Sequence, residues 1–399
     1  MVARGVSETY AVFLLPLNDE FNWERAQLTG IYSVYMLAHG LAAPLAGMLF
    51  DRLGPRVLYG CGLLCLGCGY FMASRLDALW QFYLCIGVMS GIGIASVGMV
   101  PASALVSRWF RGRLTTALGV AYAGLGCGVL AIVPLTQVLI ERYGWRDAYS
   151  LLGGALLVLL PALMLLPWRR YADGHPEYSR ERRERLRSGG GWTLWRALGS
   201  SAFWALFVVF FLTAVAIYAI NLQVVVYLVE IGFEPLSAAS AFGFVGMLSV
   251  VGMVATGGLA DYFGRRRMVT ISYLFTISGI LILFLLALYP SYGLLILFVL
   301  LFGASQGSRG PVISSLTARL FPGGGIGAIY GAITMGMGTG AAFGSWAAGL
   351  LHDLTDGYEM GFLLGALAAL SGLALFWLVP ALSDGRHRSA RVGEDIATE

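Results

Sequence analysis

Twelve stretches of apolar residues, each close to the length of a membrane-crossing helix, follow one another along this chain of 399 residues. A helix crosses a bilayer with about 20 predominantly apolar residues, and lipid leaves no partner for unpaired backbone groups. Only 12% of the residues are charged, against roughly a quarter in soluble domains. We therefore expect an all-α polytopic membrane protein with spans at 4–20, 27–49, 57–74, 78–107, 114–140, 147–167, 201–230, 236–259, 268–288, 292–319, 326–351 and 361–381.

These spans divide the chain into two groups of six. We predict an N-terminal half at 1–168, a cytoplasmic linker at 169–200, a C-terminal half at 201–382 and a cytoplasmic tail at 383–399. The first span is several residues shorter than a full crossing needs. Either Met1 lies inside the natural chain or the first helix is truncated.

The arginines predict the orientation of the spans. All 26 basic residues are arginine, and 21 of them, Arg4 included, fall in one alternating set of loops and ends. The opposite set holds four, namely Arg25, Arg75, Arg142 and Arg146. Because cytoplasmic loops carry the excess of positive charge, we expect both termini and the linker on the cytoplasmic side of the cytoplasmic (inner) membrane. The charge lies in loops between apolar spans and does not indicate nucleic-acid binding.

A ten-residue pattern, G-x-L-x-D-x-x-G-x-R, occurs at equivalent places in the two halves. It runs from Gly47 through Asp51 after the second span, and from Gly257 through Asp261 after the eighth. The offset is 210 residues, and it also pairs Met99 with Arg309. Two parallel six-helix repeats are a known transporter plan. An aspartate here can accept hydrogen bonds from the first amides of a facing helix and pair with a basic residue, and such contacts can hold the halves in one state. The predicted gating residues are Asp51, Arg52, Arg56, Asp261, Arg265 and Arg266.

The repeated loop resembles the signature of the major facilitator superfamily, over essentially the whole chain. The segment from Thr9 to Gln27 and the segment Tyr143–Tyr149 further resemble the branch of monocarboxylate porters and oxalate–formate antiporters. This resemblance implies a secondary active transporter that moves a small organic anion by alternating access. The transport would be driven by proton symport or by anion exchange.

Arg309 is the lone charge in an apolar stretch at 292–317. A charge near the bilayer centre costs at least about 2.5–3.5 kcal/mol, so such a residue is a functional candidate. Members of the resembled branch are expected to carry their anion-binding basic residue in the eighth span, but 236–259 has no charge here. Two interpretations stay open. Arg309 holds the carboxylate of the substrate, or it pairs structurally with a buried acid or with helix-end carbonyls.

Other polar residues in the predicted spans are weaker candidates. Glu8 is the acid expected at membrane depth and would couple a proton, unless it lies at the wet end of a late-starting helix. His39 is a second proton candidate, or a helix-contact histidine. Amides and tyrosines on apolar helices also serve in helix packing. The substrate-binding candidates besides Arg309 are Asn221, Gln223, Tyr10, Tyr122, Tyr218 and Tyr330.

Three classes of function compete. The leading one is the organic-anion transporter, with the substrate anion, a proton or counter-anion and the lipid bilayer as partners of a monomeric chain. The alternative from the same fold is an exporter of amphipathic compounds, in which Arg309 is structural. A transporter-like sensor or scaffold is the third. An enzyme is not expected, because no nucleophile–histidine–acid set lies at matching depth, and neither a metal site nor a cofactor is predicted.

Overall fold

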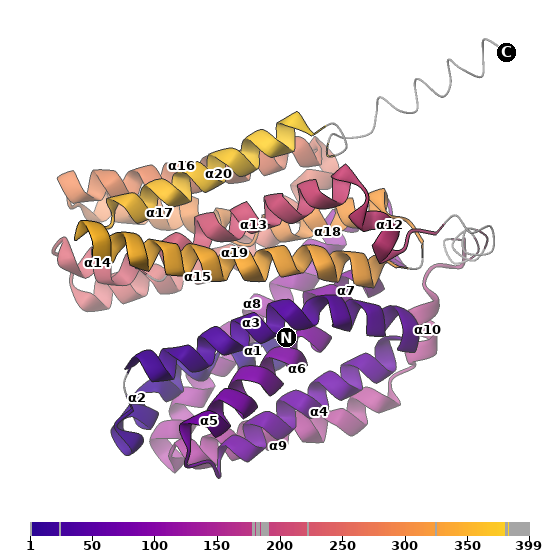
Figure 1. The fold of residues 1–399 in the computed structure, drawn as a ribbon, viewed down its shortest axis with the longest axis horizontal. Coiled ribbons are helices and arrows are strands. Elements are labelled where there is room, and N and C mark those ends of the chain that lie inside the picture. The colour runs from indigo at the N-terminus through magenta and orange to yellow at the C-terminus, as the bar shows by residue number, and fades with distance from the viewer. Residues whose placement is uncertain are drawn as a thin grey trace.

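The computed structural model describes residues 2–23, 25–177, 180, 184, 191–221, 223–323, 325–379 and 382. The predicted tail and much of the predicted linker lie outside these residues. The described chain is helical and forms two bundles, drawn from indigo to pink and from pink to yellow in Figure 1. The expected all-α fold of twelve spans in two halves is confirmed.

The N-terminal half contains six spans. Its helices are α1 (Val2–Ser7), α2 (Tyr10–Phe21), α3 (Arg25–Leu53), α4 (Pro55–Ala73), α5 (Leu79–Phe82), the π-helix η1 (Tyr83–Met89), α6 (Ser90–Val97), α7 (Met99–Val106), α8 (Leu114–Tyr143) and α9 (Trp145–Leu165). The short α10 (Trp168–Asp173) follows and begins the linker.

The C-terminal half repeats this order after the short α12 (Leu194–Leu198). Its helices are α13 (Ser201–Asn221), α14 (Val224–Glu230), α15 (Pro235–Phe263), α16 (Arg265–Leu288), α17 (Tyr292–Ser305), α18 (Arg309–Leu320), α19 (Ile326–Thr355) and α20 (Glu359–Leu378). Ten described helical segments are long and apolar enough to cross a membrane. The divided α1–α2 span and α8 complete the set of twelve.

Spans 1, 4, 7 and 10 are each interrupted, while their neighbours run through. The fourth span breaks at Gly98, directly before Met99, and the tenth breaks at residues 306–308, directly before Arg309. Gly307 has φ +75°, a left-handed conformation that glycine adopts without strain. The two breaks therefore fall at the positions that the 210-residue repeat makes equivalent.

The halves meet where α3 packs along α19 and α8 packs along α15. Both crossings are made by glycines, because a side chain there would meet the backbone of the other half. A Cβ on Gly47 would collide with the carbonyl of Gly327, and one on Gly119 would lie 2.7 Å from the carbonyl oxygen of Met253. Small residues allow this close approach of helices within a membrane.

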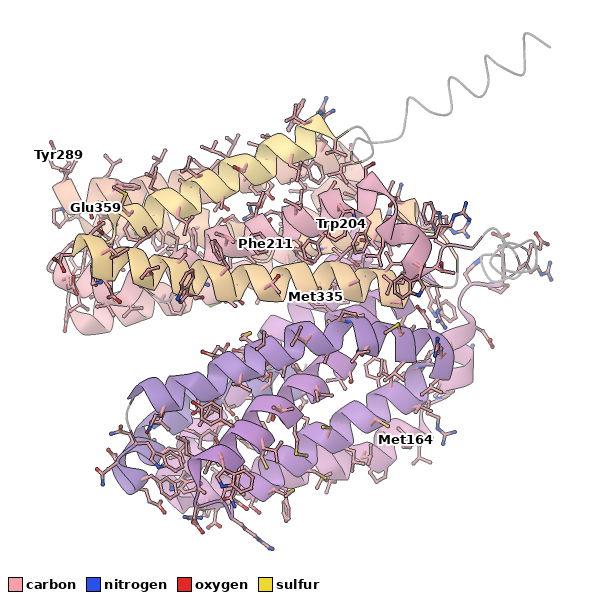
Figure 2. All side chains as sticks on the ribbon, viewed as in Figure 1. Met164, Trp204, Phe211, Tyr289, Met335 and Glu359 are labelled. Atoms are coloured by element: carbon pink, nitrogen blue, oxygen red, sulfur yellow. The ribbon has the colours of Figure 1, made fainter. Side chains whose placement is uncertain are left out.

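The two ends of the molecule differ. One end, here called the linker end, carries α10, α12 and the first residues of α8 and α19 (Figure 1). Tyr289 and Glu359 lie at the opposite end (Figure 2). Gly47 is near the last turn of α3 and Gly327 is at the start of α19, so their tight crossing lies at the linker end.

Replacing Gly47 with valine should therefore open the linker end. The added side chain must displace the Gly327 backbone, and overpacking of this kind costs about 1–3 kcal/mol. Spin labels on the two halves at the linker end should report a longer distance, and the melting temperature should fall. Gly349→Val is the matched control, because a Cβ at that position of α19 meets open space. The same spin-label distance and the same melting temperature in both variants would show that the crossing is not tight.

Candidate functional site

An ion pair joins two residues one helical turn apart at the break in the first span. The guanidinium of Arg4 lies 2.6 Å from the carboxylate of Glu8, and their side chains are 26% and 20% exposed. Arg4 belongs to α1, and Glu8 lies in the turn before α2. Gly5, between them, packs against the backbone of Gly128 near the middle of α8. The pair is therefore inside the bundle, at mid-depth of the neighbouring helices.

Aromatic side chains surround this ion pair. Tyr32 of α3 donates its hydroxyl hydrogen to Glu8 at 3.1 Å, and Arg4 donates to the Tyr35 hydroxyl at 3.3 Å. The His39 ring is stacked on Tyr35 with centroids 6.5 Å apart. Tyr218 of α13, in the other half, is close enough to interact electrostatically with both charges of the pair. The Arg4–Glu8 cluster is defined here as Arg4, Glu8, Tyr32, Tyr35, His39 and Tyr218.

The cluster corrects one sequence expectation. Arg4 was counted among the loop arginines, but it lies in α1 and contacts Tyr35 in the first half of α3. The glycine contact between Gly5 and Gly128 brings α1 against the middle of α8. The i,i+4 spacing of Arg4 and Glu8 is visible in the sequence, and it is the signal that could have identified the pair.

Arg309 lies elsewhere, inside the C-terminal half. Its side chain is 1% exposed; it donates to the Thr276 hydroxyl at 2.6 Å and its guanidinium lies 4.3 Å from the centre of the Tyr273 ring. Both partners belong to α16. The neighbouring residue Gly310 faces the other half, because a Cβ there would lie 3.7 Å from Met99 and Tyr122. In this conformation the Arg309 side chain therefore points away from the other half. Thr276 and Tyr273 are neither the buried acid nor the helix-end carbonyls of the structural interpretation, and Nε and Nη1 of Arg309 are buried without a hydrogen-bond partner among the described residues. Substrate binding by Arg309 stays a prediction.

Three other predicted ligands also lie within one half. Tyr10 is 2% exposed and donates to the Leu28 carbonyl at 2.8 Å, so it packs inside the N-terminal bundle. Asn221 and Gln223 flank the break between α13 and α14, and their side-chain oxygens are buried without a hydrogen-bond partner among the described residues. The Gln223 oxygen faces Gly361 of α20. Asn221 and Gln223 do not join the Arg4–Glu8 cluster, whereas the Tyr10 ring is stacked on Tyr32 of the cluster with centroids 6.5 Å apart.

Tyr122 and Tyr330 instead join the two halves. Their hydroxyls are 3.2 Å apart, and both side chains are fully buried. A hydrogen bond between the hydroxyls of Ser103 and Ser314 also crosses the junction. Each half contributes one tyrosine and one serine, at positions 208 and 211 residues apart. The two predicted tyrosine ligands thus form part of a closure between the halves.

The comparisons with known proteins agree with this architecture. The family model described as "Major Facilitator Superfamily" matches residues 1–334 and 250–395. The chain belongs to the major facilitator superfamily. It is accordingly a secondary transporter and not an enzyme.

Curated relatives of this superfamily member confirm the branch resemblance. Monocarboxylate transporter 13 of Rattus norvegicus is 27% identical over 99% of this chain and 90% of its own length. Monocarboxylate transporter 3 of Rattus norvegicus is 28% identical over 93% of this chain and 76% of its own length. Both alignments span nearly all of the chain.

Solved structures of superfamily members share the fold. The proton:xylose symporter XylE has a TM-score of 0.76 at 15% identity, covering 95% of this chain and 93% of its own. The human organic anion transporter MFSD10 has a TM-score of 0.68 at 17% identity, covering 94% of this chain and 97% of its own. At such identities the likeness concerns the fold alone.

The two superfamily signature loops make the contacts that their sequence predicts. Asp51, at the end of α3, accepts the Ala328 amide at the start of α19 at 3.0 Å. Asp261, at the end of α15, accepts the amide and the hydroxyl of Thr116, at the start of α8, at 2.8 and 2.9 Å. Each aspartate therefore caps the first turn of a helix in the opposite half, where the helix dipole favours a negative charge.

The signature arginines divide into two groups. Arg265 is 3.5 Å from Asp261 and donates to Thr115 of the other half at 3.3 Å, so it belongs to the junction. Arg266 lies over the Trp377 ring and donates to its carbonyl, which ties α16 to α20 within one half. Arg52 and Arg56 are exposed at the end of α3 and the start of α4. A gating role stays a prediction for all of the signature aspartates and arginines.

The substitution Asp261→Asn should weaken the closure at the linker end. It removes a charge that accepts two hydrogen bonds across the junction, and a hydrogen bond to a charged group contributes about 1.5–3 kcal/mol. Single cysteines at the linker end should become roughly tenfold or more accessible to a charged thiol reagent, at unchanged protein yield. Asp51→Asn should act in the same direction, with one bond lost. Asp353→Asn, an exposed residue outside the junction, is the control. Unaltered accessibility in both signature variants would refute the gating role.

Proposed function

We propose that this transporter moves a small organic anion of the monocarboxylate type by alternating access. The transport is coupled to a proton or to exchange with another anion. The chain is placed in the cytoplasmic membrane as a monomer, with the linker end in the cytoplasm, because the loop arginines gather at that end. The start of α1, expected in the cytoplasm from the sequence, lies instead at mid-depth of the bundle (Figure 1). The relatives named monocarboxylate transporters support this substrate class. The closures described above make the present conformation closed toward the cytoplasm.

The partly exposed Arg4–Glu8 pair is the observation that carries the proposal. A guanidinium held beside residues of both halves offers a bidentate site for a carboxylate. Its present counter-ion, Glu8, is itself a carboxylate, so a substrate anion can take the same place. Removal of one partner from a buried pair is costly, and Glu8 would then be stabilised by a proton. Proton uptake by Glu8 is thus linked to anion binding by Arg4.

The tyrosines of the cluster define the shape of this site. Tyr32 and Tyr35 contact the two charges from α3, and Tyr218 of α13 interacts with them electrostatically. Hydroxyls can donate to the second oxygen of a carboxylate, while the rings contact a short apolar body. His39, stacked on Tyr35, extends the polar lining. The site is suited to a small anion with one carboxylate.

One observation favours the alternative function, export of amphipathic compounds with a structural Arg309. Arg309 contacts Tyr273 and Thr276 within the C-terminal half, so it does not face the junction in this conformation. The two functions differ at Arg4, because an exporter of amphipathic compounds does not need an exchangeable cation there.

Arg4→Gln should lower the affinity for the best-binding monocarboxylate of a panel by about 10- to 100-fold. The loss corresponds to about 1.5–3 kcal/mol for a charge-assisted hydrogen bond. Arg4→Lys should restore part of the affinity, because an ammonium lacks the planar fork. Arg309→Gln should lower the melting temperature but leave the affinity of the folded protein nearly unchanged. Isothermal titration of purified protein measures the affinities and a thermal unfolding scan measures the melting temperatures, with Arg75→Gln as an exposed control. A loss of affinity at Arg309 with none at Arg4 would move the site to Arg309.

Glu8→Gln should separate proton coupling from anion exchange. Glutamine keeps the size of the side chain but cannot take up a proton, so the site no longer changes charge with pH. In liposomes, uptake driven by a pH gradient should fall at least about tenfold, while exchange of labelled for unlabelled anion continues. Gradient-driven uptake at the unmodified rate would exclude Glu8 as the coupling residue and leave His39 to be tested by His39→Gln.

A further inference from the structure

A tyrosine of another helix contacts the break in the first span. Tyr70 of α4 donates its hydroxyl hydrogen to the Val6 carbonyl at 2.7 Å, and its side chain is 1% exposed. Leu63, Leu66 and Tyr70 recur at helical spacing on one buried face of α4, and they share the core of the N-terminal half with Val6. The buried tyrosine therefore joins α4 to α1 by apolar packing and by a hydrogen bond.

The Val6 carbonyl is the point at which the first span leaves the helical path. In a continuous helix it would accept the amide of Tyr10, four residues further on. Here it accepts the amide of Thr9 at 3.1 Å, and the Thr9 hydroxyl donates to the same oxygen at 2.7 Å. With Tyr70, three donors converge on one carbonyl, whose two lone pairs are then fully used. These contacts stabilise the tight turn between α1 and α2 against the continuous helix.

The turn determines where the ion pair lies. Arg4 precedes Val6 by two residues and Glu8 follows it by two, so Val6 is the middle of the segment that carries both charges. In the function proposed above, the substrate anion displaces Glu8 from Arg4, and the ion pair then no longer holds the segment. The hydrogen bond from Tyr70 to Val6 uses neither charge, so it can persist while the pair is open.

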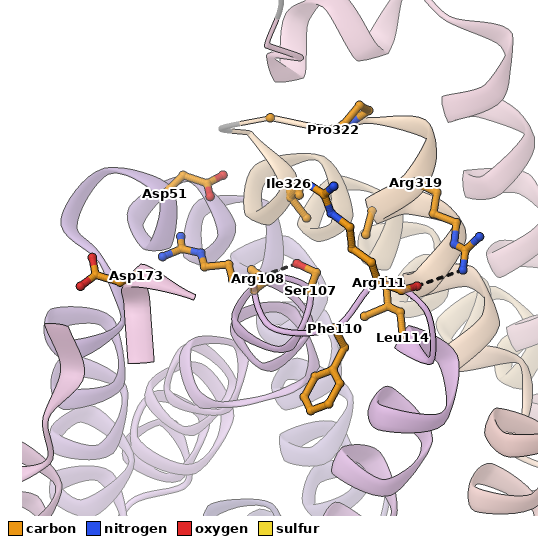
Figure 3. A pocket seen from close by; sticks show the side chains of 13 residues that line it. Asp51, Ser107, Arg108, Phe110, Arg111, Leu114, Asp173, Arg319, Pro322 and Ile326 are labelled. Carbon is orange, nitrogen blue, oxygen red and sulfur yellow. Dashed lines mark hydrogen bonds between the residues drawn. The ribbon is translucent and has the colours of Figure 1, made fainter. Parts of the chain in front are cut away.

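The Tyr70 contact lies within one half, unlike the closure at the linker end. There Asp51, Arg111 and Arg319 line a cavity of about 320 Å³ between the halves, and Arg319 donates to the Arg111 carbonyl across the junction (Figure 3). Contacts across the junction break when the halves rock apart, whereas contacts inside one half move with it. Tyr70 can therefore hold α1 in both conformations of the transporter.

We propose that Tyr70 is a positioning residue of the anion site. Through the Val6 carbonyl it holds Arg4 where the anion binds, in the conformations open to either side of the membrane. The proposal rests on the function proposed above, in which Arg4 binds the anion. Without the Tyr70 hydroxyl the turn loses a partner, and α1 can shift toward the continuous helix. Arg4 then meets the anion in a poorer geometry, while the rocking of the halves is unchanged.

Exchange of labelled for unlabelled anion by the full chain in liposomes separates positioning from folding. The probe is whichever of acetate, lactate and pyruvate the unmodified protein exchanges fastest. Tyr70→Phe keeps the ring and removes the hydroxyl. We expect its KM to rise about three- to tenfold on either side of the membrane, with the maximal rate per folded molecule within about twofold. A merely structural role would lower the amount of folded protein and the total rate, but it would leave KM unchanged.

Tyr149→Phe is the matched control. Tyr149 is also buried, its ring centre lies 5.5 Å from that of Tyr70, and its hydroxyl has no hydrogen-bond partner among the described residues. Its replacement should leave KM unchanged. Thr9→Val removes the other hydroxyl from the Val6 carbonyl. It serves if Tyr70→Phe does not fold, and it should also raise KM.

Hydrogen exchange of the backbone amides of α1 gives a second readout that needs no substrate. Mass spectrometry should show several-fold faster exchange in Tyr70→Phe and unchanged exchange in Tyr149→Phe. Unchanged exchange in Tyr70→Phe overturns the proposal, because the hydroxyl then does not hold the turn. So does a rise of KM on one side of the membrane alone, which would assign Tyr70 to gating.

Arg4→Gln in the same assay separates the two proposals. If Arg4→Gln raises KM and Tyr70→Phe does not, the positioning role is overturned and the function proposed above stands. If Arg4→Gln leaves KM unchanged, or if the unmodified protein exchanges none of the three acids, the proposed function fails and the role of Tyr70 in anion binding fails with it. Amide exchange then still shows whether Tyr70 holds the break.

Discussion

Inside a membrane every backbone amide and carbonyl must find its partner within the protein, and this constraint determines where this chain can leave the helical path. The breaks in spans 1 and 10 show how it is met. Thr9 donates its hydroxyl to the Val6 carbonyl at 2.7 Å, and Ser308 donates to the Ser305 carbonyl at the same distance. Each hydroxyl adds a hydrogen bond to a carbonyl that also accepts the backbone amide of the same residue, in the turn that follows the helix. Breaks with such local partners can lie deep in the bundle.

The same breaks bring polar side chains to that depth. Glu8 and Arg309 lie at the interruptions of spans 1 and 10. The two intramembrane arginines are stabilised in different ways. Arg4 has a counter-charge in Glu8, whereas Arg309 has a hydroxyl and an aromatic face. A counter-charge can be exchanged for another anion, but a fixed aromatic partner cannot. This difference is the physical reason for assigning the substrate to Arg4.

Much of the fold and part of the site could be predicted from the sequence. The spans, the repeat and the capping contacts of Asp51 and Asp261 follow from composition and from a motif whose chemistry is local. The rotation of the tenth span could not be predicted. Gly310 faces Met99, so the side chain of its neighbour Arg309 points into its own half, and only tertiary packing decides this.

The depth of Arg4 could not be predicted for a related reason. The arginine count assigns residues to loops by their distance along the chain from apolar stretches, and Arg4 lies at the edge of a short one. What places it inside is the contact between Gly5 and Gly128, two residues 123 positions apart. The sequence of one segment does not predict a contact between residues so far apart in the chain. The i,i+4 spacing of Arg4 and Glu8 does indicate that the two charges share a helix face.

The repeat explains why the cluster and the closures can act together. Glu8 and Tyr218 are 210 positions apart, the offset of the signature loops, and they interact electrostatically. Equivalent residues of two repeats can approach each other only close to the pseudo-symmetry axis. Ser103 with Ser314 and Tyr122 with Tyr330 also meet across the junction, at separations of 211 and 208 positions that are close to this offset. These two hydroxyl contacts use the same residue type on both sides, whereas the cluster opposes a carboxylate to a phenol. Contacts that use the same residue type in each half favour neither half when they open. The Arg4–Glu8 cluster differs between the halves, and in the function proposed above the anion binds to the half that carries Arg4.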